Sequence, residues 1–86
     1  METNIIYKYR APDAPPGSES TITAKSQDLD PNEVLTVVHP IGETITLEAD
    51  HPQEFVVIAR YPILTQFGDH GYIASILFIV ITDPES

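Results

Sequence analysis

The strongest constraint on the fold is a run of six apolar residues near the C-terminus. Residues 76–81 read Ile-Leu-Phe-Ile-Val-Ile, so a strand formed here would carry apolar side chains on both of its faces. In a two-layer β protein, one face of each strand meets the core and the other meets water. The run therefore predicts a strand covered on both faces, either by other parts of the same chain or by another subunit.

The rest of the sequence predicts a small all-β domain. Ile, Val and Thr account for 25 of the 86 residues, and eight prolines and four glycines divide the chain into short pieces. Turn residues separate five segments in which apolar and polar residues alternate or β-branched and aromatic residues are frequent. These segments are 3–9, 19–25, 43–49, 54–61 and 72–82. This pattern is typical of a small antiparallel β-sandwich or barrel of five to six strands, with residues 1–86 forming a single domain.

Two connecting segments have recognisable chemistry. Residues 10–18 contain three prolines and predict a proline-rich N-terminal loop or arm, while residues 83–86 predict a frayed tail. Asp30, Pro31 and Glu33 provide an N-cap, a first helical residue and a carboxylate in the first turn, which indicates one helical turn. The β-branched residues 34–38 that follow favour a return to strand.

The charge excludes several classes of partner. The chain has 13 acidic and 4 basic residues, giving a formal net charge of −9. Four scattered cations cannot neutralise a row of phosphates, so neither nucleic acid nor an anionic membrane is an expected partner. The longest apolar run, at 72–81, is about half the length of a membrane helix, and the N-terminus lacks a signal-peptide pattern. We therefore expect a cytoplasmic or virion protein.

The sequence carries no recognisable catalytic or metal-binding motif. There is no cysteine, no Gly-x-Ser-x-Gly and no phosphate-binding loop. His39, His51 and His70 lie in predicted turns, but their spacing does not bring two imidazoles together locally. Residues 28–32 begin like a calcium loop, but Glu33 then replaces the glycine that the turn requires. We expect no enzyme activity, no cofactor and no metal.

The apolar strand instead points to assembly. Strict alternation would place Phe55, Val57 and Tyr61 on one face of the segment 54–61 and Val56 and Ile58 on the other. The candidate oligomer interface comprises Ile76, Phe78, Val80, Val56, Ile58, Tyr7 and Tyr9. The first hypothesis is a non-enzymatic structural protein that forms a homo-oligomer or decorates a larger lattice, such as a small virion component. The alternative is a small acidic inhibitor that binds a basic, nucleic-acid-binding surface of another protein.

Overall fold

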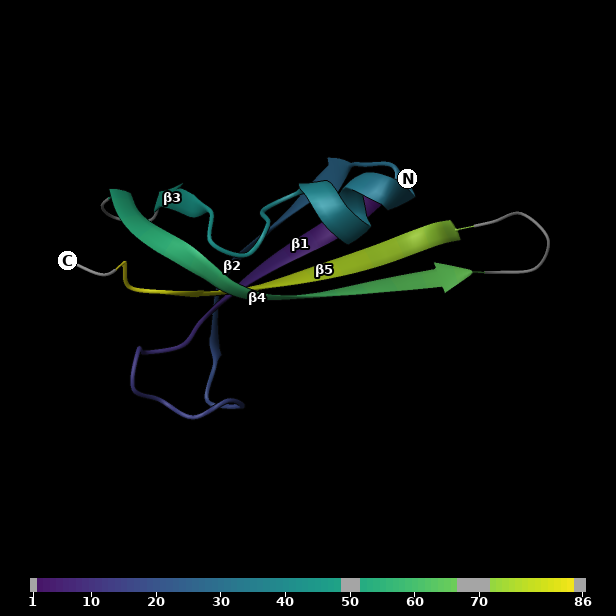
Figure 1. The fold of residues 1–86 in the computed structure, drawn as a ribbon. Coiled ribbons are helices and arrows are strands. Elements are labelled where there is room, and N and C mark those ends of the chain that lie inside the picture. The colour runs from purple at the N-terminus through teal and green to yellow at the C-terminus, as the bar shows by residue number, and fades with distance from the viewer. Residues whose placement is uncertain (1, 49–51, 67–71, 85–86) are drawn as a thin grey trace.

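The computed structural model describes residues 2–48, 52–66 and 72–84 (Figure 1). One sheet curves into a half-barrel, and a short helical segment lies over its concave side. The elements in chain order are β1 (Glu2–Tyr9), β2 (Ser20–Asp28), the π-helical turn η1 (Glu33–Val37), β3 (Thr44–Glu48), β4 (Pro52–Gln66) and β5 (Tyr72–Thr82). The expected β-rich class is confirmed.

The five strands are ordered β2-β1-β5-β4-β3, so the first and last strands of the chain are neighbours at the centre of the sheet. β1 runs parallel to β5, and the other neighbouring pairs are antiparallel. The expectation of a purely antiparallel sheet was therefore wrong. The sheet is mixed because the N-terminal strand pairs with both β2 and the C-terminal strand.

The core lies on the inner face of the sheet, which is the face covered by η1. Register places Ile5 and Tyr7 of β1 beside Leu77 and Ile79 of β5, and all four side chains are almost completely buried. The remaining buried apolar side chains of this cluster are Leu29, Val34, Ile45, Phe55, Val57 and Ile81. The odd-numbered residues of β5 face this core, which explains why one face of the strand is apolar.

The helical turn begins as the sequence predicts and then continues where a strand was expected. The Glu33 amide donates a hydrogen bond to Asp30 Oδ1 (2.9 Å), and the Asp30 amide donates to Glu33 Oε1 (3.3 Å), which forms a capping box. The hydrogen bond from the Glu33 backbone is the main reason why the pKa of Asp30 lies below its usual value. Residues 34–37 are helical rather than extended, because Val34 packs fully into the core.

Arg60 of β4 fixes the end of this helical turn. Its guanidinium donates hydrogen bonds to the carbonyl oxygens of Val34 (2.6 Å), Val38 (3.0 Å) and Leu35. A cation at the carbonyl end of a helical turn satisfies groups that lack a partner within the turn and opposes their partial negative charge. Partial burial lowers the pKa of Arg60, which nevertheless stays charged. Arg60 therefore fastens the helical segment to the sheet.

One further expectation is met in one of its two forms, the loop, and another requires correction. Residues 10–18 connect β1 to β2 as a folded loop, with turns closed by Ala14 N–Ala11 O (3.0 Å) and Ser18 N–Pro15 O (3.3 Å) hydrogen bonds, and the structure shows no extended arm in this segment. β4 continues through Pro62 to Gln66, where a loop was expected. A proline is tolerated there because β3 pairs with β4 only up to Val56, which leaves that side of β4 as an open edge.

Candidate functional site

The most exposed apolar surface of the sheet lies on its outer face, on the side away from η1. Tyr61, Phe78 and Ile6 are aligned across β4, β5 and β1, and Ile63 lies beside Ile76 one step further along. Tyr61 is 54% exposed and Ile63 48% exposed, while Ile6, Ile76 and Phe78 are half-buried. We call these five residues the outer patch. It is continuous across the three central strands.

A β-bulge explains why Tyr61 belongs to this patch. The pairing of β4 with β5 shifts between Val57 and Ala59, so Ile58 is an extra residue and the alternation reverses after it. Val57 faces the core and is 1% exposed, whereas Tyr61 lies on the outer face. Strict alternation in the sequence placed these two residues on the same face, and that expectation was wrong. No signal in the sequence marks the bulge.

The predicted interface residues are distributed over three places. Ile76 and Phe78 belong to the outer patch, while Val80, on the same face of β5, is only 2% exposed. Val56 and Ile58 line a cavity at the far end of the sheet. Tyr7 is buried in the core, and Tyr9 packs edge-on against Phe55, with ring centroids 5.8 Å apart. The sequence did not indicate Ile6, Tyr61 or Ile63 as partners of Ile76 and Phe78.

A cation lies at one end of the outer patch, on the side of Val80. Lys8 Nζ stands 5.0 Å from the centroid of the Phe78 ring, within the range of a cation–π contact. A shallow hollow of about 220 Å³ beside it is lined by Lys8, Glu19, Tyr61, Phe78 and Val80. Glu19 already accepts a hydrogen bond from Arg10, with Arg10 Nη1 and Glu19 Oε1 3.3 Å apart. The patch is therefore apolar with one positive charge, on a chain whose net charge is −9.

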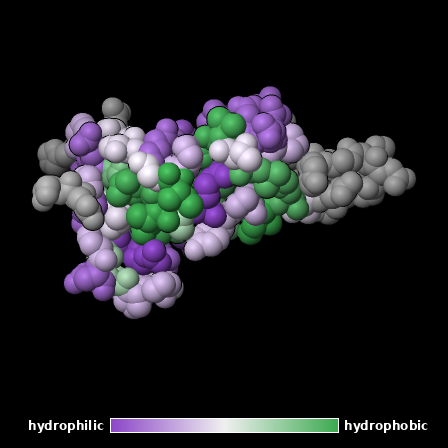
Figure 2. Space-filling view, in the orientation of Figure 1, coloured by the Kyte–Doolittle hydropathy of each residue, from purple (hydrophilic) through white to green (hydrophobic). Residues whose placement is uncertain are grey.

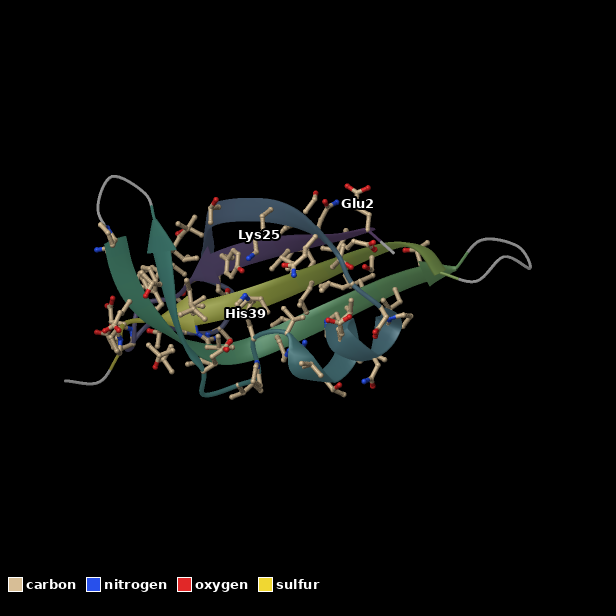
Figure 3. The ribbon with its side chains drawn as sticks, turned by 90° about the horizontal axis from the view of Figure 1, so that it is seen from above. Glu2, Lys25 and His39 are labelled. Atoms are coloured by element: carbon tan, nitrogen blue, oxygen red, sulfur yellow. The ribbon has the colours of Figure 1, made fainter. Side chains whose placement is uncertain are left out.

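A second polar cluster lies over the inner face. The Tyr7 hydroxyl is 2.8 Å from His39 Nε2, and His39 Nδ1 is 2.7 Å from Glu43 Oε2. A carboxylate only accepts hydrogen bonds, so His39 Nδ1 donates to Glu43. Nε2, when it carries no proton, accepts a hydrogen bond from the Tyr7 hydroxyl. Lys25 stands above the Tyr7 ring at 5.9 Å, and Figure 3 shows Lys25 and His39 over the same face of the sheet.

This Tyr7–His39–Glu43 chain is suited to structure rather than to proton transfer. Burial, and secondarily the charge of Glu43, raise the pKa of Tyr7 above its ordinary value of 10.0. A phenol with a raised pKa remains protonated at neutral pH and does not act as a base or nucleophile. The hydrogen bonds from Tyr7 through His39 to Glu43 give the buried Tyr7 hydroxyl a partner. They also hold His39 in a left-handed backbone conformation, with φ at 50°.

The raised pKa of Tyr7 predicts a loss of stability in alkali. The unfolded chain releases the Tyr7 proton near pH 10, while the folded chain retains it, so the unfolded state is favoured as the pH rises above 10. We expect the free energy of unfolding to be insensitive to this group below pH 9 and to fall above pH 10. Urea unfolding of the wild type and Tyr7→Phe between pH 8 and 11 measures the effect. An equally steep decline in both proteins would contradict it.

Of the three predicted turn histidines, the structure describes only His39. His51 and His70 lie outside the described residues. Among the residues that the structure describes, no group of three His, Asp or Glu side chains is arranged to hold a metal ion. Within the same residues, no helix has the length and apolar character needed to cross a membrane.

Comparison with known proteins identifies no relative. No protein-family model matches the chain, and neither a curated protein nor a solved structure matches it significantly. The functional argument therefore rests on the geometry and chemistry of the surfaces described above.

Proposed function

We propose that this protein is a non-enzymatic structural or assembly protein that self-associates through the outer patch. The observation that carries the proposal is the exposure of Tyr61 (54%) and Ile63 (48%) beside the half-buried Ile76 and Phe78. A continuous apolar surface across three strands of a small domain is costly to leave in water and marks an interaction site. Decoration of a larger lattice, such as a virion capsid, is the setting that we propose for it.

The local charge at the patch is compatible with a second copy of this chain as its occupant. Lys8 lies against Phe78 at one end of the patch, so a basic partner would be repelled there and an acidic one attracted. A second copy has 13 acidic residues, and Glu19 lies beside Lys8 at the edge of the hollow. In a two-fold arrangement the same patch meets itself, so that Lys8 of each copy can approach Glu19 of the other.

The size of the sheet also suits a dimer. A specific protein–protein interface takes about 800 Å² from each partner. The molecule measures 48 × 25 × 20 Å, so its broad outer face provides a surface of that order. Pairing two such faces would bury the apolar side chains of both copies and form a two-layer β structure, the usual way for a sheet to cover its second face.

The charge of −9 favours a second candidate, a small acidic inhibitor that binds a basic surface of another protein. Such binding would depend on carboxylates rather than on the outer patch. Its affinity would fall steeply with added salt, whereas apolar self-association would be maintained or strengthened. Salt dependence therefore distinguishes the two candidates.

Matched lysine substitutions test the patch directly. Ile63→Lys places a charge in the outer patch, and Val37→Lys places the same charge at an exposed apolar residue (58% exposed) on η1. We expect Ile63→Lys to give a folded protein with at least tenfold weaker self-association, because a desolvated lysine is costly at an interface. Val37→Lys should associate as the wild type does. Sedimentation velocity measures both, and equal association of the two variants would refute the proposal.

A further inference from the structure

A cavity of about 720 Å³ lies at the end of the sheet where β5 ends at Thr82. The loop 10–18 forms one wall, and the β4 residues Val56 and Ile58 form another, together with Ile41 and Thr82. In Figure 2 a large hydrophobic area lies directly above this loop. The volume falls within the range of about 300–1,000 Å³ that is usual for small-molecule sites.

The walls are rigid and poor in hydrogen-bond donors. Pro12, Pro16 and Pro84 line the cavity, and a proline has a fixed φ and no amide hydrogen. The loop is held in place by its own turns and by the Arg10–Glu19 ion pair at its base. A cavity with such walls is largely formed before a ligand arrives, which lowers the entropic cost of binding.

The charged groups of the lining already have partners within the protein. Arg10 binds Glu19, and Asp83 Oδ2 accepts a hydrogen bond from the Tyr9 hydroxyl at 2.6 Å. A charged ligand would have to compete with these contacts. The remaining lining is mostly aliphatic, so the cavity favours an uncharged apolar molecule.

One polar group in the lining has no partner. Thr82 is 8% exposed, and its Oγ1 is buried without a hydrogen-bond partner among the described residues. A buried hydroxyl in this state costs free energy. A rotation about χ1 of Thr82 that turned Oγ1 toward the cavity would let a ligand group give it a hydrogen bond. From the cavity, its neutral walls and this hydroxyl, we infer that the protein has a binding site for a small, uncharged apolar molecule bearing a single hydroxyl or carbonyl group.

A matched pair of probes tests this inference. 2-Naphthalenemethanol and 2-methylnaphthalene differ by one hydroxyl, and each is titrated into isotope-labelled protein while backbone amide NMR shifts are followed. We expect saturable shifts at Gly42, Ile58 and Thr82, which lie around the cavity. The alcohol should bind about two- to twelve-fold more tightly than its partner after correction for their transfer from water, the usual effect of one hydrogen bond.

Three variants locate the site and its polar contact. Thr82→Val should remove the advantage of the alcohol without weakening the hydrocarbon. Ala14→Leu, which fills the cavity, should weaken both probes at least fivefold, whereas Asp13→Leu, in the same loop but outside the lining, should not. The titration is repeated with Ile63→Lys, which should not self-associate. The same shifts in this variant would show that ligand binding does not depend on self-association. Absence of saturable shifts, or shifts centred on Ile63 and Phe78, would overturn the inference, as would an alcohol advantage that survives Thr82→Val.

Discussion

An Ile79→Asp variant is expected to be unfolded at neutral pH. Ile79 is fully buried at the centre of β5, between β1 and β4, and its side chain contributes to the core. Removal of a buried aliphatic side chain costs about 2–5 kcal/mol, and burial of an unpaired carboxylate adds several more. Stability for a domain of this length is about 4–13 kcal/mol, so the substitution is expected to exceed it. Circular dichroism and one-dimensional NMR measure the loss of fold.

The adjacent residue provides the control. Phe78 points to the opposite face of the same strand and is half-buried, next to Lys8. Phe78→Asp should remain folded at a cost of about 1–2 kcal/mol, since the new carboxylate stays in water. It should also lose self-association. If Ile79→Asp folds normally, or if Phe78→Asp unfolds as completely, the assignment of the two faces of β5 is wrong.

Arg60→Met is expected to be the most damaging substitution of a charged residue. Methionine keeps the apolar stem but loses the donors that bind the carbonyl groups of Val34, Leu35 and Val38. Hydrogen bonds that involve a charged group contribute about 1.5–3 kcal/mol, so we expect a loss of that size in urea unfolding. Hydrogen exchange should show the largest loss of protection in η1.

Lys25→Met is the matched control for Arg60→Met. Lys25 is an exposed residue of β2, and its Nζ lies 5.9 Å from the centroid of the Tyr7 ring. Its replacement should cost no more than about 1 kcal/mol, the value of an exposed cation–π contact. Equal losses in the two variants would mean that Arg60 does not fasten the helical turn to the sheet.

Strand positions were largely predictable, but strand neighbours were not. β5 extends over Tyr72–Thr82, as the β-rich composition predicts, because that segment contains no breaker. The parallel pairing of β1 with β5 joins residues about 70 positions apart, and alternation within each strand contains no information about that neighbour. Val34 and Val37 favour a strand by propensity, yet core packing of Val34 and the contacts of Arg60 make the segment helical.

The candidate surface was also partly predictable. The run of apolar residues at 76–81 predicts that both faces of its strand are buried, and this identified Ile76 and Phe78 as interface candidates. The run could not show that Val80 is buried within the chain or that Tyr61 joins the patch across a bulge. The Tyr7–His39 hydrogen bond joins residues 32 positions apart and depends on the left-handed turn at His39. These features follow from tertiary geometry, for which a single sequence has no local signal.

The central claim is that the outer patch binds a second copy of the chain. Its most direct test is the absolute mass in solution, measured by light scattering after size-exclusion chromatography over a wide range of protein concentration. We expect a mass that rises with concentration to twice the chain mass of 9.5 kDa and that persists at high salt. A constant mass of 9.5 kDa at every concentration would contradict the claim and leave the acidic surface as the better guide to a partner.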